Sequence, residues 1–359
     1  MIYYLKQFLK LWLLSVLFWT IAFSLFIFIR FVAYGEEQEA VQIINGNTSD
    51  VFSWLHFGII LGVLIGTIYT IIEFVFERII TKSIYLGLSI LFKTIIYLFV
   101  LLFSFLFIIE LAEIEMDIDL VNDIYWWFDN GIFWVVISYF FMSSLIFQFI
   151  KLANEKFGRG VLINMLTGKY RKPVEEKRLF MFIDLKSSTT IAENLGHFKY
   201  SHLLQDCFFD LNKIIGRYNA EVYQYVGDEA VLTWNYDKGI KNLRCIDVYF
   251  DFQKVLEKRS KYYLKHYKIN PFFKAGVHGG KLIVTEVGTQ KKELAYHGDV
   301  INTTSRIQDT CNKYNAFFLM SQDVIKDINL NSRYLSKEIG DLLLKGKKDR
   351  LKIYSINKM

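Results

Sequence analysis

The chain has 359 residues, of which 53% are hydrophobic, and carries a net charge of +6. This length leaves room for two domains of ordinary size. The three cysteines, Cys207, Cys245 and Cys311, lie far apart, so their spacing indicates neither a disulfide framework nor a zinc site and fits a reducing compartment. Apolar residues dominate 1–152, whereas the sequence from 153 onward has the mixed charge of a soluble protein.

The first part of the chain contains apolar stretches that are long enough to cross a bilayer, whose hydrocarbon core of roughly 30 Å needs about 20 helical residues. Lys6 and Lys10 precede the first stretch, as they would in a signal peptide. That stretch is too long for a signal sequence and three more follow it, so we interpret it as a retained helix. We predict a transmembrane domain over 1–152 with four helices at 11–33, 54–76, 84–109 and 131–152.

The charges between these stretches predict how they are oriented. Segments 34–53 and 110–130 carry acidic residues and no Lys or Arg. Because basic residues stay on the cytoplasmic side, we expect a multi-pass protein of the plasma or inner membrane, with both termini and the soluble half in the cytoplasm. The basic excess is then an orientation signal and a contact for anionic lipid, which leaves no need for a nucleic-acid partner. The basic residues on that side are Lys6, Lys10, Arg78, Lys82, Lys151, Lys156, Arg159, Lys169, Arg171, Lys172, Lys177 and Arg178.

A few polar residues interrupt the apolar stretches, namely Arg30, His56, Glu73 and Lys93. They could form a buried pair or a sensing site, for instance Glu73 with Lys93. The simpler interpretation, which we favour, is a polar contact inside the bundle or a side chain reaching toward a helix end. So few charges also make a poor transport path, which argues against a channel or transporter.

The soluble half alternates strand and helix patterns. Residues 153–177 are charged and predict a cytoplasmic linker, and 178–359 predict a catalytic domain. Gly279–Gly280 predicts a hairpin turn between two strands. The pattern is typical of an α+β domain in which helices cover a sheet rich in antiparallel strands. Strands are expected at 178–185, 221–234 (two, around a turn at Gly227–Asp228), 272–278 and 281–288, and helices at 189–217, 240–266 and 299–314.

Two carboxylates stand where strands end. Asp184 closes the first strand and Asp228 lies in the turn of the next pair. Carboxylates at the ends of adjacent strands can hold two hard cations against a polyphosphate. Ser187, Ser188 and Thr189 open the following helix, whose free N–H groups can bind phosphate. Each feature alone is equally typical of a turn or helix cap.

Five motifs occur together in one order: FIDLKSSTTIAENLG, YQYVGDEAVLTW, AGVHGGKLIVTEVG, YHGDVINTTSRIQ and LLLKGKKDRLKIYSI. Together they resemble the class III adenylate and guanylate cyclase (nucleotidyl cyclase) domain, over about 178–356. The resemblance implies a ferredoxin-like antiparallel sheet with covering helices, attached here to the four-helix transmembrane bundle. It also implies a membrane-bound enzyme that forms a cyclic nucleotide and pyrophosphate.

The resemblance implies roles for particular residues. Asp184 and Asp228, with the backbone carbonyl of Leu185, would bind two Mg²⁺ or Mn²⁺ ions. Asn302 would orient the ribose and Arg306 would stabilise developing charge, both from one helix face. The phosphates would be held by Ser187, Ser188, Thr189 and Lys345. Considered singly, Asn302 could face solvent, Arg306 could form an ordinary salt bridge, and Lys345 could belong to a solvated basic turn with Lys347 and Lys348.

The family pairs the two aspartates of one protomer with the Asn and Arg of another. This chain has one copy of each half-site, so the resemblance implies a homodimer with two equivalent active sites. The positions that read the purine fall on Gln224 and Ala295, which match neither the adenine-reading nor the guanine-reading pattern. We expect an adenylate cyclase that converts ATP to 3′,5′-cyclic AMP. A guanylate cyclase acting on GTP, or an inactive dimeric signalling module, remains the alternative.

Overall fold

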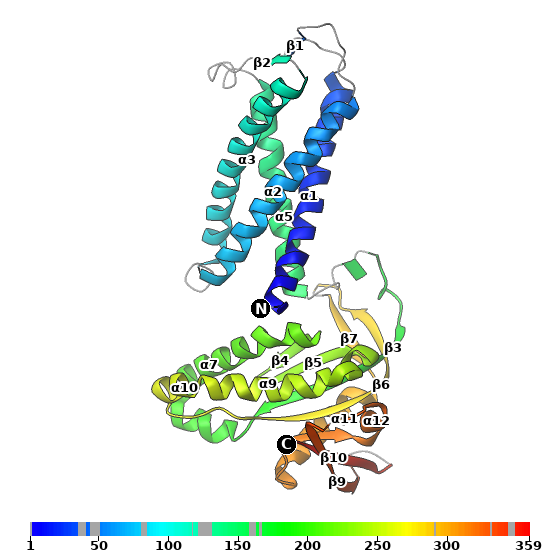
Figure 1. The fold of residues 1–359 in the computed structure, drawn as a ribbon. Coiled ribbons are helices and arrows are strands. Elements are labelled where there is room, and N and C mark those ends of the chain that lie inside the picture. The colour runs from blue at the N-terminus through cyan, green and yellow to red at the C-terminus, as the bar shows by residue number, and fades with distance from the viewer. Residues whose placement is uncertain are drawn as a thin grey trace. The chain divides into compact units, whose positions relative to one another are not determined.

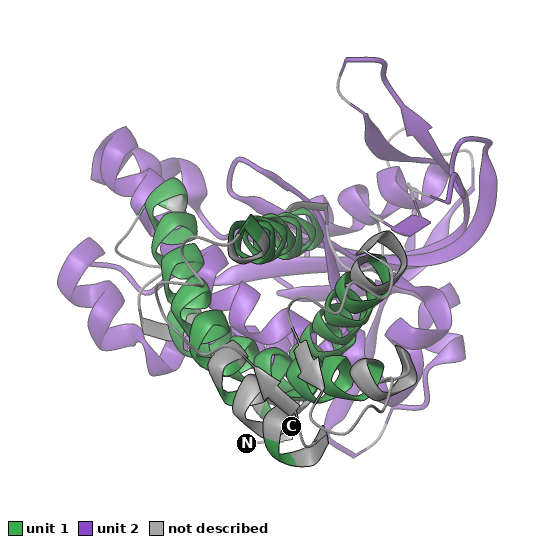
Figure 2. Cartoon of the chain, turned by 90° about the horizontal axis from the view of Figure 1, so that it is seen from above, with its two compact units in different colours: residues 1–156 green, residues 157–359 purple. Residues whose placement is uncertain are grey.

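The structure, a computed structural model, describes residues 2–34, 41–43, 51–79, 85–116, 118–120, 131–157, 163–164, 167–290, 292–330, 332–343 and 349–359. These residues form two compact units, Met1–Lys156 and Phe157–Met359 (Figure 2). We call them the N-terminal bundle and the C-terminal domain. Several charges that predict the orientation lie outside the described residues: Glu36, Glu37, Glu39, Asp50, Lys82, Asp117, Asp123, Asp129 and Arg159.

The N-terminal bundle consists of long helices (Figure 1). They are apolar and pack around an aromatic core. Trp19, Tyr69 and Phe147 are each 1% exposed, while Leu13 and Phe103 face outward. Each helix contains a segment long and apolar enough to cross a membrane, and these are Phe8–Ile29, Leu55–Phe76, Gly87–Ser104 and Trp134–Asn154. The bundle's elements are α1 (Ile2–Tyr34), β1 (Val41–Ile43), α2 (Val51–Ile79), α3 (Leu86–Met116), β2 (Ile118–Leu120) and α5 (Gly131–Phe157), with β1 antiparallel to β2.

A buried ionic cluster connects three of these helices. Glu73 of α2 is fully buried and accepts a hydrogen bond from Lys93 Nζ of α3 at 2.8 Å and one from the Tyr97 hydroxyl at 2.7 Å. Lys151 of α5 also pairs with this carboxylate. A lone buried charge is very unfavourable, so each of the three ions needs the others. Glu73 and Lys93 thus form the buried pair that the favoured, simpler interpretation had set aside.

We expect Glu73→Ala to destabilise the N-terminal bundle by about 3 kcal/mol, because it leaves Lys93 and Lys151 buried without their common carboxylate. Unfolding of the full chain by SDS titration in bicelles measures this change. Ser143→Ala removes only a local bond to the Tyr139 carbonyl and serves as the control. Equal unfolding midpoints for the two variants would contradict the role assigned to the cluster.

The C-terminal domain is built on an eight-stranded sheet with the order β4-β5-β3-β6-β8-β10-β9 (Figure 1). The eighth strand, β7, pairs with the later part of β6, whereas β8 pairs with its earlier part. All pairs are antiparallel except β6 with β8. This mixed sheet with covering helices confirms the predicted fold class. The strands are β3 (Val174–Leu185), β4 (Glu221–Val226), β5 (Glu229–Asn235), β6 (Phe273–Val287), β7 (Glu293–His297), β8 (Phe318–Ser321), β9 (Tyr334–Leu342) and β10 (Leu351–Lys358).

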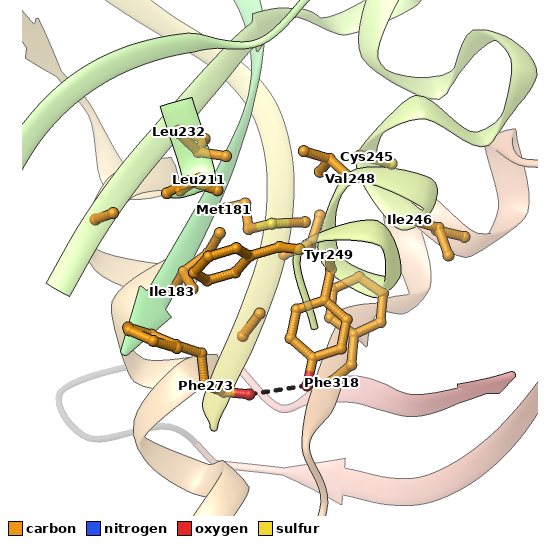
Figure 3. Close-up of a cluster of buried hydrophobic side chains, with 14 of the residues drawn as sticks. Met181, Ile183, Leu211, Leu232, Cys245, Ile246, Val248, Tyr249, Phe273 and Phe318 are labelled. Atoms are coloured by element: carbon orange, nitrogen blue, oxygen red, sulfur yellow. Dashed lines mark hydrogen bonds between the residues drawn. The ribbon is translucent and has the colours of Figure 1, made fainter. Parts of the chain in front are cut away.

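Helices cover both faces of the sheet. Alternate residues of β3 point to opposite faces. Leu179, Met181 and Ile183 belong to the larger core, which includes side chains of α7 and α9, where the Tyr249 hydroxyl donates to the Phe273 carbonyl at 2.9 Å (Figure 3). Phe180 belongs to a second cluster on the other face, where α11 packs. The helices are α7 (Ser188–Ile215), α8 (Tyr236–Ile240), α9 (Arg244–Lys258), α10 (Ser260–Tyr267), α11 (Asp299–Lys313) and α12 (Gln322–Asp327), with short 3-10 turns at Gly216–Tyr218 and Lys241–Leu243.

The predicted hairpin turn at Gly279–Gly280 is wrong. β6 runs without interruption through both glycines, and the chain turns only between Val287 and Glu293. A Cβ on Gly279 would lie 2.6 Å from the ring of Tyr236, so this glycine permits close packing within a strand rather than a turn. The helix expected over 240–266 is also wrong as one element, because it is divided into α9 and α10.

Candidate active site

Asp184 and Asp228 meet at one end of the sheet. Asp184 is the penultimate residue of β3, and its cross-strand partner is Glu229, the first residue of β5. Asp228 lies in the turn, directly before Glu229. Burial raises the pKa of the Asp184 carboxyl above its ordinary value, the nearby Lys274 opposes this rise, and the charge and hydrogen bonding of Asp228 add to it. The two aspartates are therefore close enough to repel one another, which is the geometry that two cation ligands require.

Glu229 adds a third acidic group to this end of the sheet. Burial, together with the charges of Asp184, Asp309 and Asp228, raises the pKa of its carboxyl to about 7. A divalent cation would relieve the repulsion among these carboxylates, since it would place positive charge between them.

The raised pKa of Glu229 predicts a pH dependence of stability. The folded domain keeps a proton that the unfolded chain loses above about 4.5, so folding becomes less favourable as pH rises from about 4.5 to 7. We expect the chain in metal-free buffer to be more stable at pH 5 than at pH 8, and Glu229→Gln to reduce that difference. Urea unfolding at both pH values measures it, and an unchanged difference in Glu229→Gln would exclude this cause.

Two further side chains hold the Asp184 carboxylate from the α11 side. Lys274, which pairs with Asp184 across β3 and β6, is 5% exposed and places its Nζ 3.2 Å from Asp184 Oδ2. The Gln308 amide of α11 donates to the same oxygen at 3.1 Å. Lys274 Nζ also donates to Asn312 Oδ1 at 3.1 Å. Lys274, Gln308 and Asn312 were not predicted from the sequence, although Lys274 directly precedes the Gly-rich motif.

The predicted phosphate-binding segment follows the strand end. Leu185 is the last residue of β3 and its side chain is buried in the core, while Ser187 adopts a left-handed conformation with φ 60° before α7 begins at Ser188. Thr189 is exposed on the first turn. Tyr200, which the sequence analysis missed, lies near Ser188 and Asp228, and its burial raises the pKa of its hydroxyl to about 12. The helix N-terminus thus stands beside the acidic groups, as an anion site would.

Asn302 and Arg306 lie on α11, Asn302 exposed and Arg306 half-buried. Neither side chain forms a hydrogen bond or ion pair with any described residue of this chain. The Asp184 carboxylate is instead contacted by Gln308, further along the same helix. Within one protomer, therefore, the structure brings together the two aspartates and leaves the Asn–Arg pair available for another molecule.

Gln224 and Ala295, the two positions predicted to read the purine, belong to β4 and β7, which the sheet order separates by three strands. Even so, β6 and β7 curve so far that Tyr296, next to Ala295, packs against Tyr223, next to Gln224, with ring centroids 4.9 Å apart. A β-bulge between Val222 and Gln224 interrupts the register of β4 here.

Arg178 holds this arrangement in place. It donates to the Tyr296 hydroxyl at 2.6 Å and to Glu221 of β4 at 3.2 Å, so it joins β3, β4 and β7. Sequence reasoning treated Arg178 only as an orientation charge. Lys345, the remaining predicted phosphate ligand, lies outside the described residues.

Comparison with known proteins identifies the fold. Residues 172–358 match the family described as the adenylate and guanylate cyclase catalytic domain. A stretch of 221 residues is 34% identical to Adenylate cyclase 2 of Rhizobium meliloti (strain 1021) and covers 62% of this chain and 61% of that protein. A stretch of 136 residues is 24% identical to guanylyl cyclase C of Homo sapiens, covering 38% of this chain and 13% of that one. A solved bacterial light-regulated adenylyl cyclase has a similar fold, with a TM-score of 0.51 and 17% identity over 60% of this chain and 62% of that one.

The fold and the match place the C-terminal domain in the class III nucleotidyl cyclases. The chain belongs to the adenylate and guanylate cyclase family. It spans about three fifths of the Rhizobium relative that it matches.

The donors at the strand ends suit the divalent metals that this family generally uses. Asp184 and Asp228 offer hard oxygen ligands of the kind that Mg²⁺ and Mn²⁺ prefer. Among the described residues, no three His, Cys, Asp or Glu side chains converge as a complete metal cage. A site of this kind, with few protein ligands, is typical of Mg²⁺ that is bound together with substrate phosphates.

Proposed function

We propose that this protein is a membrane-bound adenylate cyclase that converts ATP to 3′,5′-cyclic AMP and pyrophosphate at the interface of a homodimer. The observation that carries this proposal is the meeting of Asp184 and Asp228 at the strand ends beside the N-terminus of α7. The relative from Rhizobium, named an adenylate cyclase, supports ATP as the substrate.

In this reaction the 3′-oxygen of the ribose attacks the α-phosphorus while the bond to the β-phosphate oxygen breaks. The hydroxyl proton passes to solvent and pyrophosphate leaves. Asp184, Asp228 and the carbonyl of Leu185 would hold two divalent ions, which supply charge neutralisation and a lowered pKa for the 3′-hydroxyl. The backbone N–H groups of Ser187, Ser188 and Thr189 would hold phosphate oxygens, with Lys345 at the terminal phosphates.

The other half of each active site would come from the second protomer. Its Asn302 would orient the ribose, and its Arg306 would stabilise charge on the transferring phosphoryl group. These two side chains have no partner among the described residues of their own chain, which fits a role across the interface. In-line displacement depends on positioning and electrostatics, so no protein nucleophile is required.

The four apolar helices support an anchor in the membrane, with the cyclase domain and both termini in the cytoplasm. The homodimer and the linker at 153–177 would then let a change in helix packing alter the alignment of the two half-sites, where a displacement of about 1 Å can reduce the rate about a hundredfold.

Purified full-length protein with Mn²⁺, assayed with ATP and GTP side by side, tests the proposal. We expect cyclic AMP and pyrophosphate, with a larger kcat/KM for ATP. A larger value for GTP would indicate a guanylate cyclase, because Gln224 can donate and accept hydrogen bonds and could contact either purine. No cyclic product from either nucleotide would indicate an inactive signalling module.

A further inference from the structure

Asp184 is held within its own chain by groups that a bound cation would displace or oppose. The Lys274 ammonium lies 3.2 Å from Asp184 Oδ2, and the Gln308 amide contacts the same oxygen at 3.1 Å. Lys274 is almost fully buried, so its charge is poorly screened by water. A divalent ion arriving at Asp184 would therefore meet a like charge close to one of its ligands.

The contact with Gln308 depends on the close approach of α11 to β6. Gly276 faces this helix, and a Cβ at that position would lie 2.5 Å from the Gln308 backbone nitrogen. The carboxylate is thus held by a helix packed directly on the strand beside it. Lys274 adds a second link to the same helix through Asn312 Oδ1 at 3.1 Å.

The same helix carries Asn302 and Arg306, the side chains proposed to serve the partner's site. Gln308 lies two residues after Arg306, and Asn312 lies about one further turn along the helix. α11 therefore contacts Asp184 of its own protomer through Gln308, and the same helix carries, in its preceding two turns, the Asn302 and Arg306 proposed to serve the other protomer.

We propose that Lys274 and Gln308 are positioning residues that hold Asp184 before a divalent cation binds, and that α11 transmits cation binding at one active site to Asn302 and Arg306 of the other. This inference rests on the proposed function. Lys274 acts as a counter-ion that keeps Asp184 in position and weakens the binding of a cation alone. The cation and the nucleotide phosphates would displace Lys274 together.

Mn²⁺ binding to the full-length protein, followed by the electron paramagnetic resonance of free Mn²⁺ in the absence of nucleotide, tests this inference. We expect Lys274→Met to bind Mn²⁺ about tenfold more tightly, because the competing buried charge is removed, and to have a lower kcat at saturating Mn²⁺. Lys274→Arg should restore an affinity close to that of the wild type. Lys281→Met, on an exposed part of β6 where Lys281 pairs with Glu175, is the matched control and should leave the affinity unchanged.

Hydrogen exchange provides the second measurement and remains informative if Lys274→Met does not fold. Mn²⁺ should change the exchange of α11 in the wild type, and Gln308→Met should abolish that change while the β4–β5 turn still responds. An Mn²⁺ affinity of Lys274→Met that equals or falls below that of the wild type would overturn the inference, as would an unchanged response of α11 in Gln308→Met. Failure of the wild type itself to bind Mn²⁺ would instead overturn the proposed function.

Discussion

Asp228→Ala is expected to lower kcat for cyclic AMP formation by about 10³-fold while the fold is preserved, because the change removes one of the two carboxylates proposed to hold the divalent ions. Asp228 lies in the turn after β4, outside the buried core, so its removal creates no cavity. It also removes a charge that raises the pKa of Asp184, and the variant should therefore be no less stable than the wild type without metal. Initial rates at saturating Mn²⁺ and ATP measure the effect.

Asp237→Ala is the matched control, since Asp237 is an exposed aspartate in the first turn of α8, past the opposite end of β5 from Asp228. It should retain the wild-type kcat. Activity of Asp228→Ala within about tenfold of the wild type would show that Asp184 and Asp228 do not hold the cations. Loss of a metal ligand that stabilises the transition state by several kcal/mol would reduce the rate by much more than tenfold.

The chain order of elements could be predicted from the sequence because local signals determined it. The alternation of β3 and the turn at Gly227–Asp228 are short-range patterns, and the hairpin of β4 and β5 forms where they indicate. The same patterns placed Asp184 and Asp228 at strand ends, where antiparallel pairing through β5 brings them together.

The continuity of β6 could not be predicted, because two adjacent glycines are a strong local signal for a turn. The reason for Gly279 lies in tertiary packing: the ring of Tyr236 and the side chain of Leu179 occupy the space that a Cβ would need. Gly276 has a similar explanation in the approach of α11. A propensity argument cannot distinguish a glycine needed for a turn from one needed for contact with a distant element.

The surroundings of Gln224 and Ala295, the positions predicted to read the purine, also depend on long-range geometry. The contact of Tyr223 with Tyr296 and the bridge through Arg178 both follow from the curvature of the β6–β7 hairpin, and residue spacing carries no information about that curvature. Lys274 was missed for a related reason. A lysine before a glycine-rich segment resembles a solvated residue until the strand register places it opposite Asp184.

Each chain carries one copy of each proposed half-site, so two inactive variants should restore activity when they form a mixed dimer. In the proposed dimer, Asp228→Ala would damage only the metal half-site and Arg306→Ala only the half-site presented on α11. A dimer of either variant alone has two defective sites, whereas a mixed dimer has one site with both defects and one site with neither. The structure permits this separation because Asp228 and Arg306 belong to different elements, the β4–β5 turn and α11.

Co-expression of the two variants in equal amounts should therefore restore activity to about a quarter of the wild-type value, since random pairing makes about half of the dimers mixed and each has one intact site of two. Each variant alone should show about 10³-fold less activity than the wild type. Purification by two different affinity tags, one on each variant, isolates the mixed dimer and should double the recovered rate to about half of the wild type. A mixed dimer as inactive as its parents would mean that each active site is assembled within one protomer. Arg306 would then have to lie beside Asp184 of its own chain, a position that Gln308 occupies in the structure.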